Sequence, residues 1–476
     1  MAETGQSFIK KIIGFSLVTW ITFALSFITA PISTRLFNPD VLGRINIFNT
    51  YSNLFGVLIL IGLDQAYARF YNERPNNRSK GYLLSFCFAT AYALIFILSA
   101  IAVPFHDTLS VVLFDETTNF SLILLFISVF CTASLRYLNL TYRMEQDIRM
   151  FTIQGVLMAV VSKILHIIVG FWNPSYEPAL LVSTIAHLLL TVIFIIIQHN
   201  RFDKIKIVDS FFAKELFRFA IPLIPVSILS WLNSSIPQLV MQRTMDYYSI
   251  GIFTSAMALA NLILVIQSGF NSFWVPYTYE NYKTQTGQFF KIHRCLVCIL
   301  TIFALILICS QDIIFLLLGQ KYRAAKEFFP FLILGPVCYV VGEVAGVGIN
   351  ISKKTYYNIV VFISSVIVNI VACLSLRIPL GVAGIAMATS FAAITAMVVK
   401  TIIGERFYKV VISYKYMFFC VIILLVASAA TLWIHNAYIR FATIVCLLIS
   451  SCIFYRKEIF ELFNVALSFM RKNKTL

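Results

Sequence analysis

Long apolar stretches separated by short charged loops fill nearly the whole chain, and this pattern limits the possible folds more than any other feature. A helix that crosses the hydrocarbon core of a membrane needs about 20 apolar residues, so fourteen such helices need roughly 280 residues. The chain has 476 residues, of which 60% are hydrophobic and 12% are charged. A soluble domain carries about 25% charged residues, so a soluble fold is excluded.

Alternating strands of about ten residues, which mark an outer-membrane barrel, are absent from the sequence. The spans are therefore expected to be helices, whose backbone groups are satisfied internally. We predict an all-α integral membrane protein with about 14 transmembrane helices. Their approximate bounds are 11–34, 46–66, 82–104, 118–139, 150–171, 178–198, 219–241, 250–272, 292–318, 328–351, 357–376, 381–402, 412–433 and 437–455.

The second six spans repeat the first six. TRLFNPDVLGRINIFNTYSN (34–53) aligns without gaps with QRTMDYYSIGIFTSAMALAN (242–261), so that Arg35 meets Arg243, Gly43 meets Gly251 and Asn53 meets Asn261. Such repeats are a common way to build a transporter. We predict two pseudo-symmetric six-helix lobes with a linker between them. The predicted domains are an N-terminal lobe (1–198), a cytoplasmic amphipathic linker (199–218), a C-terminal lobe (219–405), and two extra helices with a basic tail (406–476).

The basic residues predict the orientation. If the N-terminus is cytoplasmic, most of the 37 Lys and Arg residues fall in cytoplasmic segments, so the positive-inside rule places both termini in the cytoplasm. The net charge of +16 is then mainly a topology signal. No basic domain stands apart from the spans, which argues against nucleic-acid binding. The ten cysteines lie almost wholly in apolar segments, and Cys295 and Cys298 form a lone CxxC. That motif lacks the second ligand pair of a zinc site, so we expect no metal and no cofactor.

Several segments resemble a known family. These are TRLFNPDVLGRINIF, GLDQAYARFY (62–71), FRFAIPLIPVSILSWLNSS (217–235), LLLGQKYRAAKEFFPFLILG (316–335) and LRIPLGVAGIAMATS (376–390). Together they resemble Wzx-type flippases of lipid-linked oligosaccharides (O-antigen, capsule or exopolysaccharide), within the multidrug/oligosaccharidyl-lipid/polysaccharide superfamily. The resemblance covers roughly residues 10–405 and includes no catalytic signature.

The resemblance implies two six-helix lobes around a central cavity that opens to either side of the bacterial inner membrane in turn. The implied substrate is an oligosaccharide on a polyprenyl diphosphate carrier, and the implied partners are membrane lipids and other polysaccharide assembly proteins. One departure concerns the seventh span. Such proteins often carry an Asp-Arg pair where this chain has Pro237 and Gln238, so a symmetric ligand model is in doubt.

Lys163 and His166 are the first candidates for a cavity-lining site. Lys163 lies near the middle of the fifth predicted span, and His166 lies one turn on, on the same helix face. A central Lys costs about 2.5–3.5 kcal/mol on insertion scales and so normally faces a cavity or a partner. It would attract a diphosphate or an acidic sugar. The alternatives are a Lys that snorkels or pairs structurally, and a hydrogen-bonded core histidine.

Other charged residues are candidates at the ends of spans. Arg35 ends the first span, Arg69 the second and Arg136 the fourth, and each is either a substrate contact or an anchor at the interface. Asp64 lies five residues before Arg69, beyond the spacing that favours a direct pair. Glu343 lies inside the tenth span and is a candidate for taking up a proton or cation, as is Asp64. A buried ion pair across the lobes is the alternative for Glu343.

The sequence therefore predicts a flippase that moves a lipid-linked oligosaccharide to the outer leaflet by alternating access and is not an enzyme. A gradient of protons or cations, or the membrane potential, would drive the step. Two alternatives stay open. A cation-coupled drug antiporter of the same superfamily would favour buried carboxylates over a central Lys. A polysaccharide polymerase would need a long outside loop with catalytic residues, and none is found.

Overall fold

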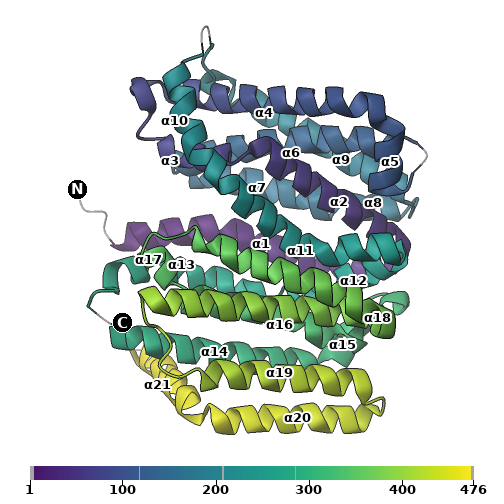
Figure 1. Ribbon diagram of the computed structural model, residues 1–476, viewed down its shortest axis with the longest axis vertical. Helices are drawn as coiled ribbons and strands as arrows, with labels where there is room; N and C mark the ends of the chain where they lie inside the picture. Colours follow the sequence, from purple (N-terminus) through teal and green to yellow (C-terminus); the bar gives the residue numbers. More distant parts are fainter. Residues whose placement is uncertain (1–4, 117, 206–207, 285, 473–476) are drawn as a thin grey trace. The chain divides into compact units, whose positions relative to one another are not determined.

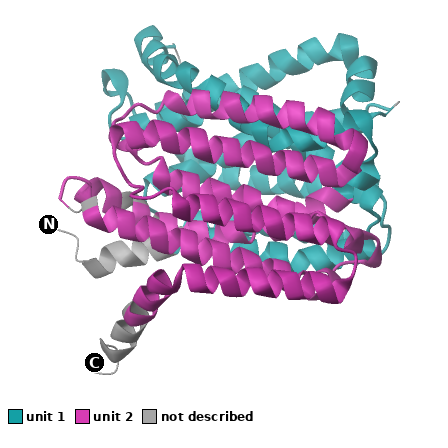
Figure 2. Cartoon of the chain, turned by 60° about the horizontal axis from the view of Figure 1, so that its bottom comes forward, with its two compact units in different colours: residues 1–251 teal, residues 252–476 magenta. Residues whose placement is uncertain are grey.

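The computed structural model describes residues 5–116, 118–205, 208–284 and 286–472, and every regular element in them is a helix (Figure 1). The chain divides into two compact units, residues 1–251 and 252–476 (Figure 2). The predicted domain boundaries near 198, 218 and 405 rest on the sequence repeat rather than on contacts, and they remain predictions.

The first unit holds the helices up to α11 and the first turn of α12. Its helices are α1 (Gly5–Leu36), α2 (Pro39–Leu60), α3 (Leu63–Phe70), α4 (Lys80–Ala102), α5 (His106–Phe114), α6 (Phe120–Met144), α7 (Ile148–Lys163), α8 (Leu165–Gly170), α9 (Tyr176–Ile197), α10 (Ser210–Ala220), α11 (Ile224–Thr244) and α12 (Tyr247–Ala260), with short 3₁₀ turns η1 (Pro75–Asn77), η2 (Val103–Phe105), η3 (His199–Arg201) and η4 (Ile221–Leu223).

The second unit continues from α12. It contains α13 (Ile263–Asn281), α14 (Thr286–Cys309), α15 (Gln311–Leu317), η5 (Gln320–Glu327), α16 (Phe329–Ala345), α17 (Gly348–Ile351), α18 (Tyr357–Phe407), α19 (Lys415–Trp433), α20 (Ala437–Phe454) and α21 (Arg456–Lys472).

Ten of the described helices or helix runs are long and apolar enough to cross a membrane, or up to 12 if each of two bent pairs is one span. The predicted second span is one of those pairs, because α2 and α3 meet at an angle of 50°. Helix α18 covers two predicted spans. Its 51 residues would be about 76 Å long if straight, against about 30 Å of hydrocarbon. The non-helical backbone at Gly381, with φ +55°, divides it. Each of the fourteen predicted spans thus coincides with helical structure.

Each unit is built around one largely buried helix. In the first unit α6 packs against α2, α4, α7 and α9, and the aromatic residues Tyr67, Tyr137 and Tyr142 are fully buried there. In the second unit α16 packs against α13, α14, α18 and α19. Burial on nearly all sides explains why the sequence of α16, FPFLILGPVCYVVGEVA, is apolar with little periodicity.

Two repeat-equivalent glycines, Gly43 and Gly251, lie in contact where the start of α2 meets the first turn of α12. A Cβ atom added at Gly43 would lie 1.9 Å from the carbonyl oxygen of Tyr247, and one added at Gly251 would lie 1.9 Å from that of Pro39. Arg44 stacks over the Tyr247 ring at 4.5 Å. Small residues allow such close approach between helices in membranes.

We expect Gly43→Ala to destabilise the protein by about 1–3 kcal/mol, because backbone rather than a flexible side chain has to move. Thermal unfolding in detergent would measure the loss. Gly335→Ala is the matched control, since the space beside Gly335 on α16 is open, and it should leave the unfolding temperature unchanged or raised. Equal stability of Gly43→Ala and the natural protein would contradict the close packing.

Candidate functional site

Lys163 and His166 lie at a break between helices in the first unit. Helix α7 ends at Lys163 and α8 begins at Leu165, and Ile164 between them keeps a right-handed helical backbone with φ −105° and ψ −39°. The His166 Nε2 atom lies 3.2 Å from the Ser33 hydroxyl on α1, and its ring is 6.0 Å from that of Phe37. The histidine is therefore held against the last turn of α1.

Lys163 differs from the charged candidates that form ion pairs because, within the described residues, its ammonium has no hydrogen-bond or ion-pair partner, a property that it shares among the candidates with the exposed Arg35. Its side chain is half-buried. A half-buried cation without a protein partner is costly in an apolar medium, so it needs water, a lipid headgroup or a bound anion. This is the property expected of a cavity-lining cation.

Asp64 and Arg136 form an ion pair that spacing along the chain did not predict. Asp64 lies on α3 and is 8% exposed. Arg136 on α6 donates from Nη2 at 2.9 Å and from Nε at 3.3 Å to Asp64 Oδ2, and Gln65 donates to the same oxygen at 3.0 Å. Two candidates that the sequence placed in different roles, cavity lining and ion coupling, are thus joined.

The other two arginines are exposed. Arg69 at the end of α3 pairs with Glu73 at 2.7 Å, one turn on, and not with Asp64. Arg35 lies exposed at the end of α1. Both positions suit contact with charged headgroups at an interface, and neither brings its guanidinium into the group formed by Lys163 and His166.

Glu343 belongs to the second unit and pairs with Lys400, which reaches it from α18. Neither side chain is fully buried. This ion pair lies within a single unit, whereas the alternative for Glu343 was a buried pair across the lobes. Among the described residues, no cluster of three or more His, Cys, Asp or Glu side chains is placed to hold a metal ion.

A set of uncharged polar residues joining α2 and α11 was missed by the search for charges. The Thr50 hydroxyl donates to Gln238 Oε1, and the Tyr51 hydroxyl donates to Gln242 Oε1 at 3.0 Å. Trp231 Nε1 donates to the Thr50 carbonyl oxygen at 3.1 Å. The sequence does carry a signal for this set of residues. Gln238 and Gln242 are four residues apart, so they share one face of a helix and would form a polar patch on it.

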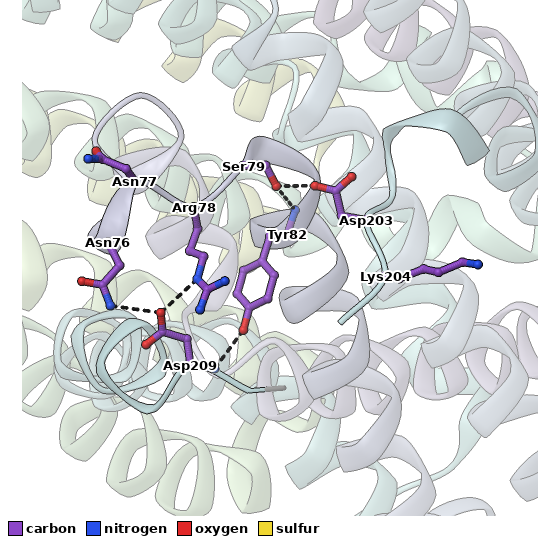
Figure 3. Close-up of a pocket in the computed structure, with 8 residues that line it drawn as sticks. All are labelled: Asn76, Asn77, Arg78, Ser79, Tyr82, Asp203, Lys204 and Asp209. Atoms are coloured by element: carbon purple, nitrogen blue, oxygen red, sulfur yellow. Dashed lines mark hydrogen bonds and ion pairs between the residues drawn. The ribbon is translucent and has the colours of Figure 1, made fainter. Parts of the chain in front are cut away.

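A polar cleft of about 630 Å³ lies where the segment before α4 meets the segment before α10, and Figure 3 shows its lining. Asp209 accepts hydrogen bonds from Asn76 at 3.0 Å and Arg78 at 2.9 Å, and it caps α10 by accepting from the Phe212 N–H at 3.0 Å. The Ser79 hydroxyl donates to Asp203. The Arg78–Asp209 ion pair and the two hydrogen bonds to Asp203 and Asp209 fasten these two aspartates to the segment before α4.

The solved structure of the lipid II flippase MurJ in its inward closed conformation is similar with a TM-score of 0.67 and 14% identity, and the match covers 94% of this chain and 99% of that one. An inward-facing multidrug resistance MATE family transporter of the MOP superfamily gives 0.53 at 15% identity, covering 81% and 94%. A MATE structure in complex with MaD3S gives 0.54 at 16% identity, covering 83% and 95%.

The fold is therefore that of a multi-pass α-helical membrane protein of the MurJ and MATE type. The model of the polysaccharide biosynthesis protein family matches residues 32–327, more than half of the chain, so this protein belongs to that family. No curated protein matches it in sequence.

We expect loss of the Arg136–Asp64 ion pair to destabilise the protein more than loss of the Arg69–Glu73 pair. Arg136→Ala would leave the nearly buried Asp64 without its cation, which should cost about 1–3 kcal/mol. Arg69→Ala removes only an exposed pair, worth about 0–1 kcal/mol. Thermal unfolding of both variants in detergent would measure this. The double variant Asp64→Asn/Arg136→Ala should recover part of the loss. Equal unfolding temperatures for the two single variants would contradict the assignment.

Asp209 predicts a pH-dependent attachment of the segment before α10. Hydrogen bonds from Asn76 and the Phe212 N–H, and the Arg78 guanidinium, lower the pKa of Asp209 to about 2. In the folded protein the pKa of Asp209 is therefore below its usual value of about 3.9. The bonds from Asn76 and Arg78 to the Asp209 carboxylate are complete above that usual value and are lost as the pH falls through about 2.

We expect Asp209→Ala to speed tryptic cleavage within residues 201–209 at neutral pH. Asp246→Ala is the matched control, because Asp246 caps a helix by accepting from the Ser249 N–H at 2.8 Å and lies outside this cleft. Unchanged cleavage of Asp209→Ala would show that the segment is held by other contacts.

Proposed function

We propose that this protein is a flippase that moves a polyprenyl-diphosphate-linked oligosaccharide from the cytoplasmic to the outer leaflet of the bacterial inner membrane, for surface polysaccharide synthesis. The observation that carries the proposal is the half-buried Lys163, which has no hydrogen-bond or ion-pair partner among the described residues. The family match and the MurJ-like fold support the class of substrate, a glycan on a lipid carrier.

The charges suit an anionic substrate. A diphosphate is a dense anion, and a Lys ammonium binds phosphate as a point charge. Lys163 has that charge available, with His166 beside it. Arg136 is half exposed and uses only two of its N–H groups on Asp64, so further donors remain for a phosphate. Arg35 and Arg69 would meet the headgroup at the membrane surface, with both termini cytoplasmic.

The carboxylates argue against the antiporter alternative. A cationic drug would need a buried carboxylate free to receive it, whereas Asp64 is paired with Arg136 and Glu343 with Lys400. If either carboxylate couples transport to a proton or cation, the step has to release its basic partner. A proton or cation shifts the equilibrium between the inward-open and outward-open states only by the difference in its affinity for them. Release of the basic partner in one state would supply such a difference.

We expect Lys163→Ala to lower surface-glycan export by at least roughly tenfold, because a hydrogen bond to a charged group contributes about 1.5–3 kcal/mol. The assay is complementation of a strain that lacks this protein, with lipid-linked precursor and protein level measured together. Lys163→Arg should retain part of the activity. Lys204→Ala, which removes an exposed lysine of the polar cleft, should export normally.

Normal glycan export by Lys163→Ala at normal protein level would remove the site assignment. Efflux of a cationic dye that depends on this protein, together with unchanged glycan in its absence, would favour the antiporter.

A further inference from the structure

Helix α21 follows α20 after a single residue, and Figure 1 shows it turning away from the line of α20. Helix α20 has 18 residues and is about 27 Å long, close to the roughly 30 Å of hydrocarbon that a span has to cross. Because α20 is itself one of the candidate spans, α21 begins where the chain leaves the hydrocarbon.

The corner between α20 and α21 is fixed by Tyr455. This side chain is fully buried, and its hydroxyl donates to the carbonyl oxygen of Tyr416 on α19 at 3.1 Å. Its ring lies edge to face with that of Phe419, with 5.6 Å between the ring centres. Packed side chains therefore hold the direction in which α21 leaves α20.

Two ion pairs hold one face of α21 against α14. Lys291 Nζ lies 3.3 Å from Glu461 Oε2, and Arg294 Nη1 lies 3.5 Å from Glu458 Oε1. Glu458 is only 2% exposed. The two basic residues are three apart on α14 and the two acidic residues are three apart on α21, so the pairs join one face of each helix. Both carboxylates of α21 are thereby turned toward the protein.

The opposite face of α21 is exposed and apolar. Phe460 is 66% exposed and Phe463 is 59% exposed, and with Arg456 they follow the i, i+4, i+7 spacing of one helix face. Arg456 and Lys457 are exposed as well. The described part of α21 thus presents two phenyl rings and two cations outward, while its carboxylates pair with α14.

The position and chemistry of this face favour lipid as its partner. Ile453 on the last turn of α20 is 64% exposed, so exposed apolar side chains occur on both sides of the corner. Phenyl rings with basic residues beside them are typical of a helix that lies among lipid headgroups. Two phenylalanines offer at most roughly 500 Å², which is far less than the roughly 1,200–2,000 Å² buried in a stable protein interface.

We propose that α21 lies on the membrane surface at the end of α20 and binds anionic lipid headgroups. Arg456 and Lys457 contact the headgroups, and Phe460 and Phe463 insert at the boundary of the acyl chains. The predicted orientation makes this the cytoplasmic leaflet, whose anionic lipids attract basic segments. The two ion pairs then tie the start of α14 to the membrane surface. The inference goes beyond the proposed function, because it holds whichever molecule the protein moves.

The depth of Phe460 can be measured on the full-length protein in nanodiscs that each hold one copy. Genetically encoded dansylalanine in place of Phe460 gives a fluorescent label, and lipids that carry a nitroxide quench the label when they are close. One nitroxide is placed on the headgroup and another near the end of the acyl chain. In discs of phosphatidylcholine and phosphatidylglycerol, we expect the headgroup nitroxide to quench the label more strongly than the acyl-chain nitroxide.

Two other positions calibrate the label. At Cys446, which is exposed near the middle of α20, the acyl-chain nitroxide should quench more strongly. At Lys204, which is exposed in the polar cleft of the first unit, both nitroxides should quench least. This second position also shows whether the dansyl group enters lipid by its own affinity.

The role of charge is tested by removing either the anionic lipid or the cations. With phosphatidylcholine alone we expect weaker quenching of the label in place of Phe460, because each Lys or Arg near an anionic surface strengthens attachment roughly fivefold. The double variant Arg456→Gln/Lys457→Gln should give the same low quenching with either lipid composition.

Quenching at position 460 as weak as at position 204 would place α21 in water. Stronger quenching by the acyl-chain nitroxide would make α21 part of a span, and equal quenching with and without phosphatidylglycerol would exclude recognition of anionic headgroups. Shielding of the label only in discs that hold two copies would identify a second copy of the chain as the partner. Each of these results would overturn the proposal, and none bears on the export test of Lys163.

Discussion

The high cost of an unpaired polar group in an apolar medium governs this structure at every level. It requires the backbone to be helical wherever the chain crosses the hydrocarbon, and it requires side-chain charges there to find partners. Asp64 finds Arg136, and Glu343 finds Lys400. The uncharged residues follow the same rule, as the bonds of Gln238 and Gln242 to α2 demonstrate.

Against that background one exception, Lys163, carries the functional argument. Lys163 in the first unit is half-buried with its ammonium unpaired among the described residues. An unpaired ammonium of this kind suits an anion.

The similarity to MurJ and MATE structures at about 15% identity shows how little of the sequence the fold demands. What the fold requires is apolar length, close helix contact and breaks in a few places. Gly43 and Gly251 provide the close contact in the first unit, and Gly381 divides the long α18 in the second. The polar residues are freer to vary, so the fold alone does not identify the substrate.

The sequence by itself determined the class of protein, because apolar length and the period of a helix are local properties of the chain. It located the spans, and it picked out Lys163, Asp64 and Glu343 as charges that a membrane would otherwise exclude. It could not choose their partners. Asp64 pairs with a residue on α6 rather than with nearby Arg69, and Glu343 pairs with Lys400 on another helix.

Tertiary structure also decided that α13, α16 and α17 enclose a cavity, although Asn271, Trp274 and Thr278 share a helix face that the sequence spacing could have revealed. Which helix faces that stripe, and whether its donors are satisfied, depends on how side chains from distant segments pack. Those contacts are set by three-dimensional complementarity, and no periodicity along a single chain encodes them.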